Sequence, residues 1–241
     1  GYFWTKSNNK DYDFIYVYQV SPLTQVLPAV WYSKKKNIPL VLYVTDLWPD
    51  NLIAIIGLKN ILIINLIKKM AKYIYNSSKI VITTTNSFKE SIKSIGINKN
   101  KIKVLPQYAE DFYYLRIKNA LPKEFEIIEK NESFKVIFTG NIGKAQGLSK
   151  LIDVAINFRK HKEKVIFILL GNGSYKNKFK KLIKANSLQD YFLFFDKQNP
   201  QMVPNILSKV DAALIMLKDS VLFEKTIPSK LQSYMAFGIP I

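Results

Sequence analysis

A glycine-rich segment between a predicted strand and a predicted helix is the first place where this chain could do chemistry. Residues 139–148 read TGNIGKAQGL, and glycines allow the backbone to approach an anion closely. A helix that begins directly afterwards would point free N–H groups and its positive end at a phosphate. The segment matches neither GxGxxG nor GxxxxGK(S/T), so it predicts an anion site without indicating a dinucleotide or P-loop site. A glycine-lined turn without a ligand is the alternative.

A second segment predicts the same chemistry at the start of a later helix. Thr226 and Ser229 offer hydroxyl groups there. Lys230 places a positive charge in the first turn of a helix that ends near Gly238. A Lys in that position opposes the helix dipole, so it is unfavourable unless an anion neutralises it. The conflict favours a diphosphate site over a solvated charge.

Two shorter segments lie at the carboxyl ends of other predicted strands. Asp46 follows a strand at residues 40–45, and functional groups commonly lie at this end of strands in parallel sheets. An Asp that forms a turn and caps the next element is the alternative for Asp46. Residues 170–174 read LGNGS, and this short turn is by itself typical of a structural loop.

Strands and helices alternate along the chain, which is typical of parallel sheets covered by helices. In the first half we predict strands at 14–18, 40–45, 80–83 and 102–105, and helices at 23–36, 60–75 and 87–95. In the second half we predict strands at 134–139, 164–170, 191–195 and 211–217, a strand that begins at 239, and helices at 148–160, 175–186, 200–209 and 229–237. The fold class is therefore α/β, with two doubly wound domains.

The alternation stops between the two halves. Residues 107–133 contain no clear strand and are crowded with charged side chains, so we predict an interdomain linker at 116–132. The linker separates an N-terminal domain, residues 1–115, from a C-terminal domain, residues 133–241. The first half offers few strands for a doubly wound sheet, and the chain stops inside an apparent strand. Both domains are therefore expected to be incomplete.

The scarcity of Cys and His excludes several kinds of site. The chain has 0 Cys and 1 His, which excludes thiolate metal sites, a Cys nucleophile and a multi-His metal site. It also leaves almost no room for a His-based catalytic triad. The first residues do not resemble a signal peptide, so a cytoplasmic location is expected.

The net charge of +18 comes almost entirely from Lys, because only Arg116 and Arg159 are arginines. Proteins that bind nucleic acids use Arg for bidentate contacts, so no nucleic-acid partner is expected. Two interpretations of the Lys excess remain. It is either a compositional bias toward Lys, Ile and Asn, or a means of binding an anionic partner such as a lipid surface.

Four motifs in this order resemble the family 4 retaining glycosyltransferases. They are YVTDLWPD at 43–50, FTGNIGKAQG at 138–147, LGNG at 170–173 and IPSKLQSYMAFGIP at 227–240. The likeness is strongest for the branch that builds bacterial surface polysaccharides such as O-antigen and capsule and includes fucosamine-type transferases. The resemblance covers essentially the whole chain. It implies a GT-B fold, in which two Rossmann-like domains face a cleft and the C-terminal domain binds a nucleotide sugar.

The resemblance also implies roles for individual residues. Asp46 would be the catalytic residue that faces the acceptor or donor sugar. Lys144 and Lys230 would supply positive charge to the leaving diphosphate, and residues 198–202 would meet the base. The implied donor-binding residues are Gly140, Asn141, Gly143, Lys144, Gln146, Gly173, Gln198, Met202, Thr226, Pro228, Ser229 and Lys230. Neither a metal nor a cofactor is implied, because helix N-termini and Lys would take the place of a metal ion.

The implied reaction moves a sugar, for which a UDP-linked amino-deoxysugar is expected, to a lipid-linked or glycan acceptor with retention of configuration. Some positions depart from the family pattern. Asn141 and Gln146 stand where many relatives carry Arg and Lys, and Thr45 stands where many carry His. Lys225 and Ser233 occupy the positions of the family's Glu-x7-Glu pair. A non-catalytic paralogue that binds nucleotide sugars or glycans is therefore the alternative function.

An apolar run at residues 52–67 predicts contact with an anionic membrane surface. It is too interrupted by polar residues to span a bilayer. Five lysines lie within it or just beyond it: Lys59, Lys68, Lys69, Lys72 and Lys79. An amphipathic helix of this composition can lie in the interface at the inner face of the plasma membrane. A core helix packed under its own sheet is the alternative.

Overall fold

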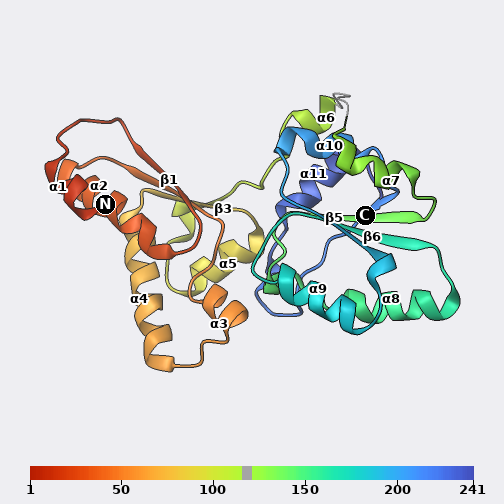
Figure 1. Ribbon diagram of the computed structural model, residues 1–241. Helices are drawn as coiled ribbons and strands as arrows, with labels where there is room; N and C mark the ends of the chain where they lie inside the picture. Colours follow the sequence, from red (N-terminus) through yellow and green to blue (C-terminus); the bar gives the residue numbers. More distant parts are fainter. Residues whose placement is uncertain (116–120) are drawn as a thin grey trace. The chain divides into compact units, whose positions relative to one another are not determined.

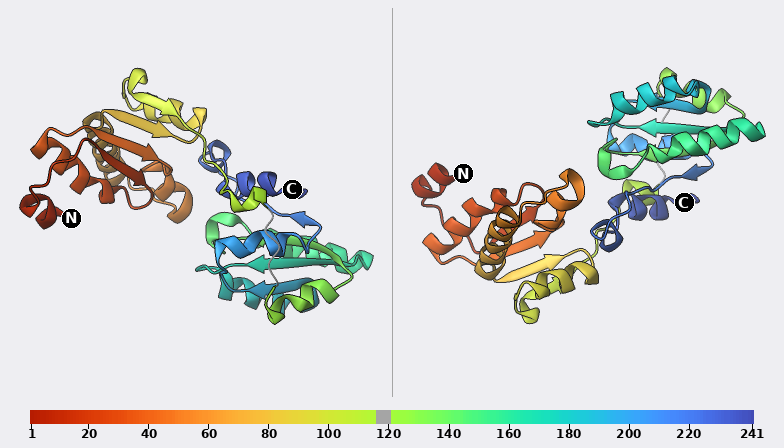
Figure 2. Two further views of the ribbon diagram at one scale, coloured as in Figure 1. Left: turned by 90° about the horizontal axis from the view of Figure 1, so that it is seen from above. Right: turned by 90° about the horizontal axis from the view of Figure 1, so that it is seen from below.

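The computed structural model describes residues 1–115 and 121–241 and divides the chain into two compact units (Figure 1). The first unit contains Gly1–Pro106 together with Ser220–Ile227. The second contains Gln107–Asp219 together with Pro228–Ile241. Each unit has a parallel sheet of its own, which two further views also show (Figure 2).

The sheet of the first unit has its strands in sequence order, β1-β2-β3-β4, all parallel. Its strands are β1 (Ile15–Gln19), β2 (Leu40–Val44), β3 (Ile80–Thr83) and β4 (Ile102–Val104). Its helices are α1 (Tyr2–Ser7), α2 (Leu27–Lys36), α3 (Asp50–Ile56), α4 (Ile61–Ser77) and α5 (Asn86–Ser94). Because every crossover steps in the same direction and crossovers are right-handed, the helices between the strands cover one face of the sheet. Their apolar side chains join the strands in a single core that includes Leu42, Ile74 and Phe88.

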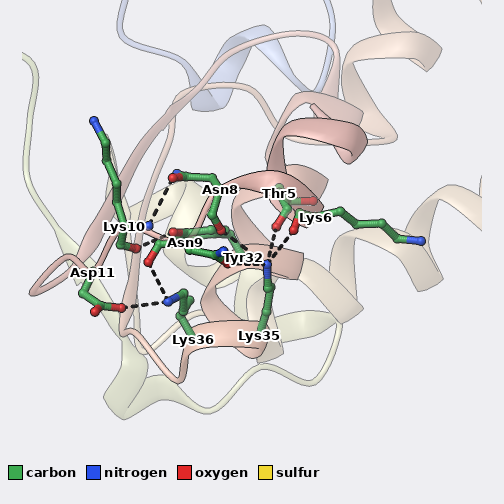
Figure 3. A network of polar contacts seen from close by, with 9 residues as sticks. All are labelled: Thr5, Lys6, Asn8, Asn9, Lys10, Asp11, Tyr32, Lys35 and Lys36. Atoms are coloured by element: carbon green, nitrogen blue, oxygen red, sulfur yellow. Dashed lines mark hydrogen bonds and ion pairs between the residues drawn. The ribbon is translucent and has the colours of Figure 1, made fainter.

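Lysines and carbonyl groups hold the N-terminal segment of the first unit against α2 (Figure 3). Lys35 Nζ donates to the carbonyls of Thr5 and Lys6, at 3.2 and 2.8 Å. Lys36 Nζ pairs with Asp11 at 2.9 Å. Some of the excess lysines are therefore structural, because a lysine side chain donates hydrogen bonds to the free carbonyl groups at the end of a short helix.

The sheet of the second unit has the order β7-β6-β5-β8, all parallel. Its strands are β5 (Phe134–Thr139), β6 (Val165–Leu170), β7 (Phe192–Phe195) and β8 (Ala212–Ala213). Its helices are α6 (Phe112–Leu115), α7 (Glu126–Lys130), α8 (Lys150–His161), α9 (Lys176–Ala185), α10 (Val203–Leu207) and α11 (Ser229–Phe237). The strand order reverses at β5, because β6 and β8 flank it on opposite sides. Ligands of open α/β sheets bind beyond the carboxyl ends of the strands at such a switch point.

Helices cover both faces of this second sheet. Helices α8 and α9 lie on one side, and α7, α10 and α11 lie on the other (Figure 1). Successive residues of β5 point to opposite faces, so Ile137 packs in the core beside α10 and α11 whereas Phe138 packs in the core beside α8 and α9. The α/β fold class with two parallel-sheet units, as predicted from the alternation of strands and helices, is confirmed.

Several predicted elements differ in extent from those observed. The predicted strand at 211–217 shortens to Ala212–Ala213, and the residues from 239 onward form no strand. The predicted helix at 23–36 is a 3-10 turn, Leu23–Val26, followed by α2, whose second residue is Pro28. Proline is tolerated there because the first helical N–H groups have no partner within the helix.

The structure divides the chain differently from the predicted linker at 116–132. Residues 116–120 lie outside the described residues, and residues 121–132 pack into the second unit. Phe125 and Ile128 are fully buried there, and Phe125 stacks on Phe195 with ring centroids 4.7 Å apart. The charged residues that suggested a linker are the solvent side of short helices whose apolar residues complete a core.

A second difference concerns residues 220–227, which the predicted boundaries place in the C-terminal domain. They pack with the first unit, where Leu222 enters the core. Phe223 packs against the same core. These contacts join the segment to residues far away in the sequence, so a local pattern does not reveal them.

Replacing Phe125 by Ala tests whether this segment is core or linker. We expect Phe125→Ala to lower the free energy of unfolding by about 3–5 kcal/mol, because it leaves a cavity beside Phe195. Ile127→Ala is the control, since Ile127 is half exposed in the next turn and should change stability by about 0.5 kcal/mol or less. Urea denaturation of both variants decides the matter, and equal stabilities would contradict the core assignment.

Candidate functional site

Two glycine-rich turns interlock at the carboxyl ends of β5 and β6. The Gly140 amide donates to the Leu170 carbonyl at 2.9 Å, and Gly140 and Gly171 adopt φ values of +115° and +147°. A Cβ at Gly171 would overlap the Gly140 carbonyl, and a Cβ at Gly173 would overlap the Ile142 carbonyl. These glycines are therefore required so that two backbone segments can touch. Gly173, predicted as a donor-binding residue, packs against the backbone of Ile142 in the loop that follows β5.

Further hydrogen bonds hold the first turn rigidly on the second. Ile142 is fully buried, its amide donates to the Asn172 carbonyl at 2.9 Å, and its carbonyl accepts from the Tyr175 amide at 3.0 Å. The loop that follows β5 is thus a fixed platform, with Asn141 and Lys144 exposed on it and Gly143 buried.

Lys176 is a structural residue of this region that the sequence analysis missed. Its Nζ donates to the Gly171 carbonyl at 3.0 Å and to Asn172 Oδ1 at 2.8 Å, and it pairs with Asp196 at 2.7 Å. The hydrogen bond and charge of Lys176 hold the pKa of Asp196 below its usual value. Lys176 is the first residue of α9, so a Lys in a first helical turn, the same signal that singled out Lys230, could have revealed it.

Lys230 carries an unneutralised positive charge against the loop. Its Nζ lies 3.7 Å from the centroid of the Phe138 ring and 3.4 Å from Gln146 Oε1. None of the ion pairs formed by the described residues includes Lys230. Burial lowers the pKa of Lys230 from 10.5 to about 8, since the charged form loses hydration and gains no carboxylate. The group is poised to accept an anion.

Tyr234 fixes the helix that carries Lys230 to the end of β5. Its hydroxyl accepts a hydrogen bond from the Thr139 amide at 3.0 Å and lies 2.9 Å from Thr139 Oγ1. Burial raises the pKa of Tyr234 to about 12, so the hydroxyl stays neutral. Because residues four apart lie on one face of a helix, this anchor directs Lys230 toward the loop. The sequence analysis did not single out Tyr234.

The structure therefore brings together Gly140, Gln146 and Lys230, and their role in donor binding stays a prediction. Gly140 lies close enough to Lys230 that a Cβ on it would be 3.9 Å from Nζ. Pro228 and Ser229 open the same helix, α11, with Pro228 as its N-cap. A phosphate bound here would meet loop amides, the positive end of α11 and an ammonium group.

Three other predicted donor-binding residues have contacts of their own. Thr226 belongs to the first unit, and its hydroxyl donates to the Leu222 carbonyl at 3.0 Å. Gln198 donates to Glu124 at 3.2 Å, and Met202 packs against the core beside α10. Their contact with a nucleotide base stays a prediction.

The two positions of the Glu-x7-Glu pattern have structural partners. Lys225 Nζ donates to Ser91 at 3.1 Å, and the Lys225 carbonyl accepts from Thr85 at 3.0 Å, all within the first unit. Ser233 hydrogen-bonds with Tyr113 in the second unit. Neither residue offers a carboxylate to a sugar.

Asp46 lies beyond the carboxyl end of β2 in the first unit. Its Oδ2 accepts from Ser21 at 2.7 Å, and its carbonyl accepts from the buried Gln19 amide group at 2.9 Å. The alternative that Asp46 caps the next helix is wrong, because α3 begins at Asp50 with Pro49 as N-cap and has no side-chain cap.

The described part of the chain contains no group of three or more His, Asp or Glu residues that could hold a metal ion. None of its helices has both the length and the apolar character that crossing a membrane requires.

One family model and one curated protein match parts of this chain. Residues 122–241 match the family model described as "Glycosyl transferases group 1". Over 103 residues the chain is 31% identical to the colanic acid biosynthesis glycosyl transferase WcaI of Escherichia coli K12. The aligned region covers 43% of this chain and 24% of WcaI.

Solved structures resemble the chain at low sequence identity. Anabaena HepE, solved with UDP and glucose, has a TM-score of 0.73 at 16% identity, over 95% of this chain and 58% of HepE. WaaG, a glycosyltransferase of lipopolysaccharide biosynthesis, has a TM-score of 0.63 at 14% identity, over 92% and 64% of the two chains. The chain thus spans less than two thirds of each relative named. These likenesses confirm the GT-B fold class.

Replacing Lys230 by Met should stabilise the fold at neutral pH. The unfolded chain keeps the ordinary Lys pKa of 10.5, so below about pH 8 the folded state bears the full cost of the buried charge. This cost shrinks as the pH rises from 8 to 10.5, because the folded protein has already lost the proton. We expect the free energy of unfolding to rise by about 2–3 kcal/mol at pH 7, measured by urea denaturation, and the gain to disappear near pH 10.5.

Lys144→Met is the matched control, because Lys144 is exposed in the same loop and its removal should give no gain. Inorganic diphosphate should raise the melting temperature of the wild type and not of Lys230→Met. A Lys230→Met variant no more stable than the wild type at pH 7 would contradict the buried, unneutralised charge.

Proposed function

We propose that this protein transfers a sugar from a nucleotide diphosphate sugar to a lipid-linked or glycan acceptor, because residues 122–241 match the glycosyltransferase group 1 family model. The process served is the synthesis of a cell-surface polysaccharide at the cytoplasmic side of the membrane. The donor is a UDP-linked amino-deoxysugar, and transfer retains the anomeric configuration. HepE, solved with UDP-glucose, supports a UDP-linked donor, and WcaI, described for colanic acid biosynthesis, supports a role in polysaccharide synthesis.

The observation that carries the proposal is the ammonium group of Lys230 beside the loop after β5. It lies at the switch point of the second sheet, where a ligand of this fold class binds. Its charge has no carboxylate partner among the described residues. A donor diphosphate supplies the missing negative charge, and exposed Lys144 on the same loop adds a second cation.

The geometry favours departure of the nucleoside diphosphate. Negative charge grows on the diphosphate as the bond to the sugar breaks, and groups already aimed at it stabilise the transition state without reorganisation. Lys230 is held in place by the Tyr234–Thr139 anchor and by the face of Phe138. Lysine and helix N-termini thus do the work that a metal ion does elsewhere.

Asp46 serves the sugar side of the reaction in this proposal. Asp46→Asn should lower kcat at least tenfold and change the Kd for the UDP-linked amino-deoxysugar less than twofold, because a carboxylate that meets the acceptor contributes chiefly in the transition state. UDP release from this donor, with a membrane extract as the source of acceptors, measures turnover. Asp50→Asn is the control, as an exposed carboxylate four residues away. Equal effects of the two variants would contradict the role of Asp46.

A non-catalytic paralogue that binds nucleotide sugars or glycans is the second candidate function. It is favoured by Lys225 and Ser233, which are engaged with Ser91 and Tyr113 and carry no carboxylate. Calorimetric binding of UDP-glucose without UDP release from any nucleotide sugar, with or without acceptors, would establish this candidate in place of the enzyme.

The surface of α4 supports the proposed contact with an anionic membrane. Only its second half is buried, through Ala71, Ile74 and Tyr75. Its first half exposes Ile61, Leu62 and Leu66, at 69%, 76% and 68%. Gly57, with φ +71°, ends α3, and the Asn60 side chain caps α4 at its first amides. The core-helix alternative therefore describes the second half of α4 alone.

Lysines precede and follow this exposed apolar segment in the sequence. Lys59, Lys68, Lys69 and Lys72 are all exposed. A helix of this kind places its apolar side chains among acyl chains and its lysines among anionic headgroups, with about 1 kcal/mol from each Lys near the surface. Such contact would bring a lipid-linked acceptor within reach.

Cosedimentation with vesicles tests the membrane contact. Binding to vesicles rich in phosphatidylglycerol should exceed binding to phosphatidylcholine vesicles, and the change of Lys68, Lys69 and Lys72 to Gln should weaken it at least tenfold. The control changes Lys178, Lys181 and Lys184 on α9 to Gln, which removes the same charge from another exposed surface. Equal loss in both triple variants would mean that net charge alone drives binding.

A further inference from the structure

The hydroxyl of Ser21 lies at the centre of a polar cluster around Asp46. Ser21 Oγ is 2.7 Å from Asp46 Oδ2, 3.2 Å from Trp48 Nε1 and 3.5 Å from Asn51 Nδ2. Ser21 comes from the segment after β1, whereas the other three residues belong to the segment between β2 and the first turns of α3. The parallel register of β1 and β2 brings these segments to the same edge of the sheet.

The protons that each side chain carries determine the direction of each hydrogen bond. The indole N–H of Trp48 and the amide N–H of Asn51 can only donate, so both point at the oxygen of Ser21. A Ser hydroxyl has one proton and two lone pairs. Because both lone pairs of the hydroxyl are occupied, its proton is donated to Asp46 Oδ2, a carboxylate oxygen that can only accept.

Asp46 is thereby held at two points. Its backbone carbonyl accepts from Gln19 Nε2 at 2.9 Å, and Gln19 is fully buried. Among the described residues, Gln19 Oε1 has no hydrogen-bond partner. A buried acceptor without a partner is energetically unfavourable and uncommon, and it often marks a functional region. No hydrogen bond of the described residues ends on Asp46 Oδ1, so that oxygen is left for another group.

We propose that Ser21 is a positioning residue for Asp46. By occupying Oδ2 it fixes the rotation of the carboxylate and leaves Oδ1 to accept a hydrogen bond from the hydroxyl of the incoming acceptor. Trp48 and Asn51 act through Ser21, because they hold its proton on Asp46. This inference rests on the proposed function, in which Asp46 meets the sugar side of the reaction.

A double-mutant cycle tests the coupling. Ser21→Ala should lower kcat for UDP release from the UDP-linked amino-deoxysugar about tenfold and leave the Kd for this donor within twofold. Ser21→Thr should restore most of the rate. In an Asp46→Asn background, Ser21→Ala should cost less than twofold more, because the group that it positions is already lost. Ser94→Ala is the control, since that hydroxyl donates only to the Ser91 carbonyl in its own helix.

A signal independent of activity completes the test. The chain has three Trp, and Trp48→Phe identifies the indole N–H resonance of Trp48 in an NMR spectrum. Ser21→Ala should shift this resonance and Ser94→Ala should not. The positioning role would be overturned, with the proposed function left standing, by either of two results. One is an unshifted Trp48 resonance in Ser21→Ala, and the other is a double variant whose loss of kcat equals the product of the two single losses. No UDP release by the wild type from any nucleotide sugar would overturn the proposed function and this inference together.

Discussion

The second unit is organised around one buried positive charge without a negative partner. The ammonium group of Lys230 stacks on Phe138 and donates to Gln146, and these are weak substitutes for the water that burial removes. The depressed pKa of Lys230 expresses that deficit. A site of this kind is stable enough to fold and is most favourable when an anion is bound, which is the requirement of a diphosphate site.

The surrounding structure keeps Lys230 in this position. The Tyr234 hydroxyl ties α11 to Thr139 at the end of β5, while Gly140, Gly171 and Gly173 let two turns touch behind the loop. Each contact joins elements that are far apart in the sequence. The site is therefore preorganised, so that little free energy is spent on ordering it when a ligand arrives.

In the first unit, too, contacts between elements that are far apart in the sequence hold one side chain in place, and these contacts are hydrogen bonds. Asp46 lies beyond the carboxyl end of β2 and is oriented by Ser21 and Gln19, which follow or end β1. Adjacent parallel strands end at one edge of the sheet, so residues 25 or more positions apart meet there. In α4, by contrast, one helix combines a buried half with an exposed apolar half, and the proposed contact with a lipid surface rests on the exposed half.

The sequence by itself determined the α/β class, since apolar runs of strand length alternate with amphipathic segments, and it located the loop after β5 and the Lys of α11. The extent of β8 and the boundary between the units were not predictable, because Phe125, Ile128 and Leu222 are buried by distant segments. Lys176 and Lys230 show the limit most clearly. Both are lysines in the first turn of a helix, and their local sequence gives the same signal. Asp196, twenty residues further on, neutralises Lys176, and no carboxylate of the described residues reaches Lys230. Only the tertiary structure decided which of the two charges is neutralised, because the partner of a charged group is set by which strands lie side by side.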